Sequence, residues 1–224
     1  MSVSYRLKLL AVYENLLARY GRQAWWPAES PFEVMIGALL AQNTRWSNVE
    51  KALANLKQQH ALTPEALLNL ATSHLEDHLK PSGYFRIKAQ RVQLYCRWYL
   101  SVGAYEGLDC FATATLRELL LKVHGIGPER ADDILLYAFH RPVFVIDSYT
   151  RRLLQRLQLI QGEECYEQLR VWVEMNLPKR VDLYQQYHAL IVMQAKQHCW
   201  KNKPDCQTCA LTSICCYGIK NKPT

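Results

Sequence analysis

Four cysteines near the C-terminal end of the chain constrain its fold more than any other feature. They are spaced Cys199-x6-Cys206-x2-Cys209-x5-Cys215. Four thiols within 17 residues rarely belong to a hydrophobic core, and the nearby lysines favour the thiolate form that binds metals. Zinc also accepts four cysteines, but usually as two C-x2-C pairs, and only one such pair is present. The spacing therefore predicts a metal-binding loop, with iron–sulfur and zinc as the two candidates.

Composition narrows the class of protein. The chain has 224 residues, with 27 Lys and Arg against 20 Asp and Glu, a net charge of +7 and a pI near 9.0. This balance favours an anionic partner such as nucleic acid without identifying one. No stretch approaches the roughly 20 apolar residues of a membrane span, and the amphipathic N-terminus has no cleavable signal pattern. We expect a cytoplasmic protein, in which eight cysteines do not form a disulfide framework.

The spacing of apolar residues is helical almost everywhere, and no alternating strand pattern of any length occurs. The chain is therefore expected to be all-α, without internal repeats or long linkers. The expected helices span residues 5–20, 31–42, 46–59, 64–70, 73–79, 86–100, 115–124, 128–139, 148–157, 163–176 and 182–198.

One pair of these helices is joined by Gly125-Ile126-Gly127. Without a Cβ, Gly125 and Gly127 allow the backbone to approach a phosphate, and the positive end of the next helix dipole lies there. An ordinary connection between two helices remains the alternative, because G-x-G alone is weak. After the second helix, the extended run 143–146 leads to Asp147, which on local sequence is most simply a helix N-cap.

Aromatic residues mark a second candidate site. Trp25, Trp26 and Pro27 lie in a loop and could either fill a core or form a stacking wall for a flipped base. Aromatic faces bind a cationic alkylated base especially well, through cation–π attraction.

A third candidate region is polar and lies at helix ends. Gln42, Asn43 and Thr44 precede Trp46, and the flexible Gly83 precedes Tyr84, our candidate for a wedge between bases. Basic residues follow from Arg86 onward, among them Lys88, and no acid occurs up to Arg97. Capping residues and a solvated face would explain these patterns equally well; a phosphate-contacting face is the functional interpretation.

Taken together, the hairpin, Asp147, the glutamine loop and the cysteine spacing resemble the endonuclease III, or helix-hairpin-helix, superfamily of DNA glycosylases. The resemblance implies a six-helix barrel lobe, residues 30–139, and a second lobe made from both chain ends, residues 1–29 and 140–224, with DNA held across the cleft. It assigns a [4Fe-4S] cluster to the four cysteines, with zinc as the alternative, and leaves room for a monovalent cation at the hairpin.

The same resemblance suggests roles for individual residues. Asp147 falls where the family has its catalytic Asp, and Gln42 where a glutamine fills the space left by the extruded nucleotide. The pocket residues would be Trp25, Trp26, Pro27, Trp46 and Glu129. The DNA-contacting residues would be Gln42, Asn43, Thr44, Tyr84, Arg86, Lys88, Gly125, Gly127, Arg130, Lys201 and Lys203.

Glu129 departs from the pattern of the bifunctional members. They have a lysine at this position that attacks the sugar to form an imine, and a carboxylate cannot form one. Asp147 would then act alone, stabilising the oxocarbenium-like sugar and the attacking water. This, with the Trp-Trp-Pro sequence, resembles the 3-methyladenine DNA glycosylase branch, although an iron–sulfur loop is not expected throughout that branch.

The sequence therefore predicts a monofunctional, monomeric DNA repair glycosylase acting on alkylated purines, 3-methyladenine and also 7-methylguanine, in double-stranded DNA, with a nucleoid-associated location and no membrane partner. Two alternatives remain. One is a mismatch or oxidised-base glycosylase of the same family, with AP lyase activity through another lysine. The other is a catalytically silent protein that binds DNA structures.

Overall fold

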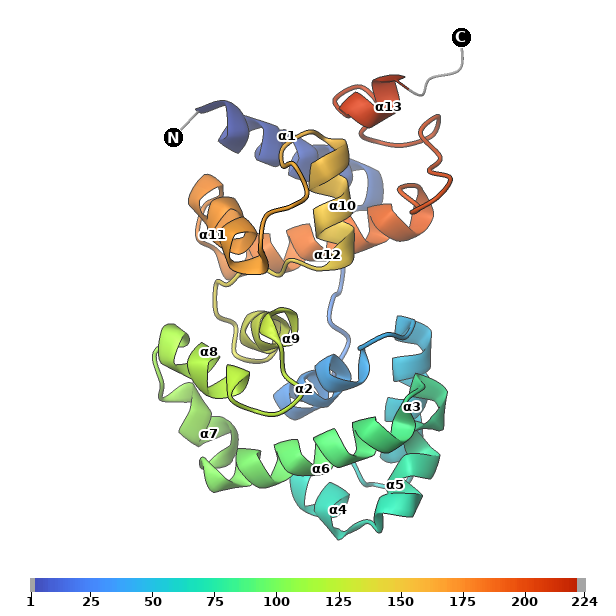
Figure 1. Cartoon of the computed structure of the whole chain (residues 1–224), viewed down its shortest axis with the longest axis vertical. Helices are drawn as coiled ribbons and strands as arrows, with labels where there is room; N and C mark the ends of the chain where they lie inside the picture. Colours follow the sequence, from blue (N-terminus) through green and yellow to red (C-terminus); the bar gives the residue numbers. More distant parts are fainter. Residues whose placement is uncertain (1–2, 221–224) are drawn as a thin grey trace. The chain divides into compact units, whose positions relative to one another are not determined.

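The computed structural model describes residues 3–220 and confirms the all-α expectation, since the described residues contain no β-strand (Figure 1). The chain forms two compact units. The terminal unit runs to Trp25 and resumes at Pro142, and the central unit spans Trp26–Arg141. None of the described helices is long and apolar enough to cross a membrane.

The central unit is built around α2 (Pro31–Leu40), whose residues 32–40 are all buried. Ser30 begins this helix by accepting a hydrogen bond from the Glu33 N–H at 3.2 Å. A helix that is apolar on all sides needs neighbours all round, and α3, α6, α9 and η2 contact it. The elements of this unit are α2, α3 (Trp46–Gln58), α4 (Pro64–Asn69), α5 (Thr72–Leu79), η1 (Lys80–Ser82), α6 (Phe85–Ser101), α7 (Ala104–Asp109), α8 (Thr113–Leu121), α9 (Pro128–Asp133) and η2 (Ile134–Ala138).

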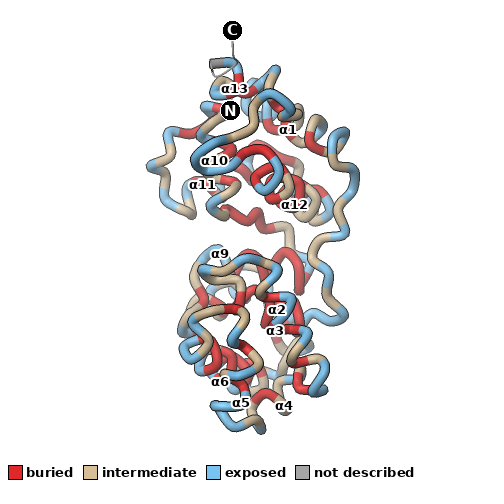
Figure 2. The backbone as a smooth tube through the Cα atoms, turned by 90° about the vertical axis from the view of Figure 1, so that its right-hand side faces the viewer, coloured by how far each residue is buried: buried red, intermediate tan, exposed pale blue. Residues whose placement is uncertain are grey.

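The terminal unit is organised around α12 (Val181–Gln197), most of which is buried (Figure 2). Helices α1 and α10 pack on α12, and α1 also contacts α11. The hydroxyl of Tyr187 donates to the Leu9 carbonyl at 2.8 Å, so the buried polar group is satisfied within the core. The elements here are α1 (Val3–Tyr20), α10 (Ser148–Arg156), α11 (Tyr166–Asn176), α12 and α13 (Cys216–Lys220).

Two short α-helices, α7 and α13, were not predicted, and neither was the short 3₁₀-helix η1. In α7 the cause is the pair Gly103 and Gly107, because glycines in a sequence usually indicate a break between helices. Gly103 has φ +85°, and a Cβ on Gly107 would lie 2.2 Å from the Val102 carbonyl oxygen. The two glycines therefore allow the backbone at Gly107 to lie close to the Val102 carbonyl, and a new helix begins after Gly103.

The second helix of the hairpin is not a uniform α-helix, as the sequence had suggested. It is α-helical in α9 and becomes a π-helix in η2, where the Phe139 N–H donates to the Ile134 carbonyl at 3.2 Å. The first hairpin helix, α8, ends at Leu121 rather than at His124. Such π-helical turns occur frequently at functional sites.

Candidate functional site

Asp147 lies at the start of α10 in the terminal unit. Its Oδ1 accepts a hydrogen bond from the Thr150 N–H at 2.7 Å, which makes it the N-cap. Its Oδ2 lies 3.6 Å from Nε2 of His188, and the Asp147 side chain is 14% exposed. One carboxylate oxygen is therefore fixed by a hydrogen bond and the other faces His188, while part of the side chain still reaches the surface.

The environment favours the charged form of this carboxyl. Burial by itself would raise its pKa, but the polar contact and charge of His188 and the Thr150 N–H more than offset burial, so the pKa of Asp147 is lowered. The positive end of the α10 dipole acts in the same direction. A carboxylate that is ionised at neutral pH can stabilise a developing positive charge.

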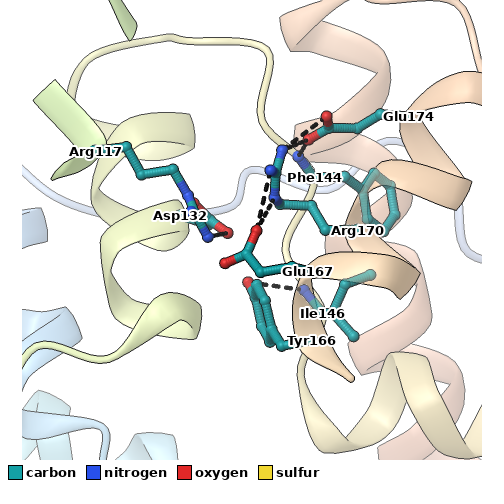
Figure 3. A network of polar contacts seen from close by, with 8 residues as sticks. All are labelled: Arg117, Asp132, Phe144, Ile146, Tyr166, Glu167, Arg170 and Glu174. Atoms are coloured by element: carbon teal, nitrogen blue, oxygen red, sulfur yellow. Dashed lines mark hydrogen bonds and ion pairs between the residues drawn. The ribbon is translucent and has the colours of Figure 1, made fainter. Parts of the chain in front are cut away.

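The extended segment that leads to Asp147 is anchored to α11 (Figure 3). The Phe144 N–H donates to Oε1 of Glu174 at 2.9 Å, and the Ile146 N–H donates to the Tyr166 hydroxyl at 3.3 Å. Arg170 in turn holds the Glu174 carboxylate, at 2.9 and 2.8 Å. These contacts satisfy backbone donors that no strand partner satisfies, and they fix the approach of the chain to Asp147.

The hairpin lies in the central unit. Gly125 has φ +92°, and a Cβ there would come within 2.7 Å of Cδ of Arg91. The Arg91 side chain therefore crosses directly over the hairpin, and its Nη1 donates to Oε1 of Gln42 at 2.5 Å. Arg91, which we had not selected, thus connects the glycine hairpin to the glutamine loop.

An ion pair joins the two hairpin helices (Figure 3). Arg117 on α8 donates to Asp132 on α9 through two hydrogen bonds, of 2.6 and 3.1 Å. The Asp132 side chain is fully buried. The two hairpin helices are therefore held together by a bidentate ion pair.

Arg130, on the same helix as Asp132, is partly buried, and burial lowers the pKa of its guanidinium.

The glutamine loop and the Tyr84 loop share a hollow of about 140 Å³, which Gln42, Asn43, Tyr84 and Arg91 help to line. Asn43 and Tyr84 both have left-handed backbones, with φ of 53° and 47°. Tyr84 is 67% exposed. Such strain in non-glycine residues tends to gather at functional sites. Thr44 instead accepts from the Asn48 side chain, at 3.1 Å.

Lys88 is placed differently from our expectation of an exposed phosphate-contacting residue. Its side chain is buried, and Nζ donates to the carbonyls of Leu40 and Ser82 at 2.8 and 2.6 Å. Burial lowers the pKa of Lys88 to about 8. Lys88 thus supports the two loops from inside, whereas Arg86 of the same helix is exposed.

The proposed pocket residues are divided between the units. In the central unit Trp26 and Trp46 pack edge to face with ring centroids 4.7 Å apart, and Gly37 of α2 provides the space for both. Trp25 belongs to the terminal unit, where Nζ of Lys196 lies 5.4 Å from its ring centroid. The remaining two pocket candidates, Pro27 and Glu129, are exposed.

All four spaced cysteines line one small cavity in the terminal unit. Gln194 Nε2 donates to Cys209 Sγ, and Arg156 Nη1 donates to Cys199 Sγ, each at 3.0 Å. Such donors suit thiolates bound to a cluster. Among the described residues, no group of three or more His, Cys, Asp or Glu side chains is arranged to hold a single ion. The donor set and its hydrogen bonds fit a cluster.

A basic groove of about 710 Å³ lies beside this cavity, and α10 and the cysteine loop line it. Its cations are Arg151, Arg152, Arg156 and Lys201, and no acidic residue lines it. Arg152 and Arg156 donate to backbone carbonyls of the loop, and Arg156 also donates to Cys199 Sγ. Lys201 and Lys203 are both exposed. We had not selected the arginines, which only this packing brings beside the loop.

Comparisons with known proteins find relatives among DNA repair enzymes. The chain is 40% identical over 209 residues to a candidate DNA repair glycosylase of Methanocaldococcus jannaschii, covering 91% of this chain and 94% of that one. It is 31% identical to endonuclease III of Thermotoga maritima, over 83% and 82% of the two chains.

Among solved structures, a complex of endonuclease III with DNA matches with a TM-score of 0.82 at 21% identity, over 96% of this chain and 97% of that chain. The H. pylori 3-methyladenine DNA glycosylase bound to 1,N6-ethenoadenine matches with a TM-score of 0.71 at 29% identity, over 87% and 97%. The family model for HhH-GPD superfamily base excision DNA repair proteins matches residues 36–175. The chain therefore belongs to the HhH-GPD superfamily of base excision DNA repair proteins, as a DNA glycosylase.

Proposed function

We propose that this glycosylase is monofunctional and hydrolyses the N-glycosidic bond of alkylated purines, 3-methyladenine first and 7-methylguanine second, flipped out of double-stranded DNA. The observation that carries the proposal is the Asp147 carboxylate at the start of α10, whose pKa is lowered, together with Glu129 at the hairpin position where a lyase needs an amine. The 29% identity to the H. pylori 3-methyladenine enzyme supports this substrate class.

The chemistry required of Asp147 is electrostatic. As the base departs, the sugar acquires oxocarbenium character, and a fixed carboxylate stabilises that charge and orients the attacking water. An alkylated purine already carries positive charge, so it leaves without a general acid. Removal of a normal adenine or thymine would demand more help for the leaving group.

The lyase reaction needs a nucleophilic amine, because only an amine forms the imine intermediate. Glu129 cannot supply one. Lys122 is exposed and follows the end of α8. We therefore propose that water, and not a side chain, attacks the sugar.

We propose that DNA is held through exposed and basic groups of both units. Tyr84 would wedge between bases and Gln42 would fill the space of the flipped nucleotide. The backbone of Gly125 and Gly127, with Asn43 and Thr44, would lie along the phosphates. The basic side chains proposed to contact phosphates are Arg86, Arg130, Lys201 and Lys203. The aromatic pocket would be formed by Trp25, Trp26, Pro27 and Trp46.

We also propose that Cys199, Cys206, Cys209 and Cys215 hold a [4Fe-4S] cluster, which would give the loop a rigid shape and present its two lysines. Zinc is the alternative, and a monovalent cation at the hairpin is a further candidate. A brown colour and equal iron and sulfide contents in the purified protein would support the cluster. A colourless, zinc-loaded protein would exclude it.

The test is a base-release assay on methylated duplex DNA, with the wild type beside Asp147→Asn. We expect release of 3-methyladenine and 7-methylguanine by the wild type only. Duplexes with oxidised pyrimidines or mismatches test the alternative that the likeness to endonuclease III of T. maritima favours. A covalent adduct trapped by borohydride would overturn the monofunctional reaction. If the wild type releases no base from any of these duplexes, the alternative of a catalytically silent DNA-binding protein is favoured.

A further inference from the structure

His188 is a buried histidine that faces the carboxylate of Asp147. It lies within α12 and is 4% exposed, and its Nε2 is 3.6 Å from Oδ2 of Asp147. The other carboxylate oxygen is already bound by the Thr150 N–H. We propose that His188 is a positioning residue for base excision, which holds the free oxygen of Asp147 and so fixes the direction of the carboxylate. The inference rests on the proposed function of Asp147.

The surroundings of His188 argue against a simple role in the core. The neighbouring buried positions of α12 are aromatic or aliphatic, including Tyr184, Tyr187, Leu190 and Ile191. Placing an imidazole among such residues is costly unless it meets a polar group. The carboxylate oxygen Oδ2 of Asp147 is a polar group that lies within 3.6 Å of the imidazole Nε2.

The distance suggests how the contact works. At 3.6 Å the contact is longer than the usual 2.7–3.2 Å of an N–H···O hydrogen bond. Catalytic hydrogen bonds are often long without substrate and shorten in the reacting complex. A contact that shortens as positive charge develops on the sugar would keep Asp147 aimed at that charge. His188 and the Thr150 N–H both favour the charged form of Asp147.

Two polar substitutions of similar size separate positioning from packing. In His188→Gln, the side-chain amide extends to about the place of the imidazole Nε2, whereas in His188→Asn it is too short to reach Asp147. We expect the single-turnover rate of base release to fall about 10- to 100-fold in His188→Asn, the usual loss when an orienting group is removed. The Gln variant should restore most of the rate.

Binding and a matched control complete the rate experiment. Affinity for a duplex with an abasic-site analogue should stay unchanged in both variants, because His188 is expected to act on the reaction and not on DNA. Tyr184→Phe, which removes a hydroxyl from the same buried stretch of α12, should keep the wild-type rate. Equal rates for the Asn variant and the wild type, or equal losses in the Asn and Gln variants, would overturn the inference.

A second readout does not depend on activity. Titration of the Asp147 carboxyl carbon by NMR should show a pKa below the usual range in the wild type and in His188→Gln, and a higher pKa in His188→Asn. An unchanged pKa in the Asn variant would overturn the contact itself. If no base is released by the wild type, the proposed function fails, while the titration still decides whether His188 acts on Asp147.

Discussion

The side-chain amide of Gln194 joins the first helix of the chain to a cysteine of the loop. Its Nε2 donates to Cys209 Sγ at 3.0 Å, and its Oε1 accepts from the Tyr20 hydroxyl at 2.8 Å. Gln194 is fully buried. Tyr20 thus fixes the orientation of the amide, so that the N–H points at sulfur.

If the four cysteines hold the proposed [4Fe-4S] cluster, this relationship predicts a change in the reduction potential of that cluster when Gln194 becomes Leu. A hydrogen bond to sulfur stabilises the reduced, more negative cluster, so its loss should lower the reduction potential by on the order of tens of millivolts. Protein-film voltammetry on DNA-free protein measures this shift. Gln197→Leu, an exposed position of the same helix, is the control and should leave the potential unchanged; equal potentials in both variants would contradict the prediction.

Asp147→Asn should separate the capping role from the catalytic role. Asn caps a helix about as well as Asp, so the melting temperature should change little at neutral pH. The rate of base release should fall by at least 10²- to 10³-fold, the usual cost of losing one electrostatic contact to a transition state. Thermal unfolding and single-turnover kinetics measure the two effects. Loss of stability in step with activity would point to capping alone.

The lowered pKa of Asp147 also predicts how stability depends on pH. Because the folded pKa lies below the unfolded value of about 3.9, the stabilisation is fully present above that value. It should be lost as the pH falls through the folded pKa. Urea unfolding at pH 7 and near pH 3 should show the wild type losing stability relative to Asp147→Asn at the lower pH; a constant difference would contradict it.

Gly125→Ala should destabilise the hairpin. Its backbone is left-handed, and the new methyl group would lie 2.7 Å from Arg91 Cδ, which displaces the contact of Arg91 with Gln42. The matched control is Gly21→Ala, where φ is +68° but no atom lies within 4 Å of the new Cβ. In both variants, placing an alanine in a left-handed backbone conformation costs about 1–2 kcal/mol of stability. Only Gly125→Ala should lose more than that in urea unfolding, and it should also bind duplex DNA more weakly.

The lowered pKa of Lys88 predicts that the stability of the protein changes at alkaline pH. Burial lowers its pKa from 10.5 to about 8, so between these values the unfolded chain binds more protons than the folded protein does. The wild type should therefore gain stability as the pH rises through this window, by up to about 3 kcal/mol. Lys88→Met should lack this gain. Urea unfolding at pH 7.5 and pH 10 provides the comparison, and parallel behaviour of the two proteins would rule the effect out.

Local patterns in the sequence were enough to predict most of the longer helices, the glycine hairpin and the place of Asp147 at a helix start, and to single out the four spaced cysteines. Each of these depends on residues a few positions apart, so helical periodicity, capping and ligand spacing report them directly. Glu129 could also be interpreted from the sequence alone, because a carboxylate cannot form an imine in any surroundings.

The partners of these residues were decided only by the tertiary structure. His188 beside Asp147, Arg91 across Gly125, and Gln194 against Cys209 each join segments distant in the chain. Lys88 is a further case that the sequence alone could not predict. It lies on a helix whose basic residues suggested a solvated face, yet its Nζ is buried and donates to two backbone carbonyls. Buried polar groups must find partners, but the sequence does not say which ones, because packing between distant helices brings them together.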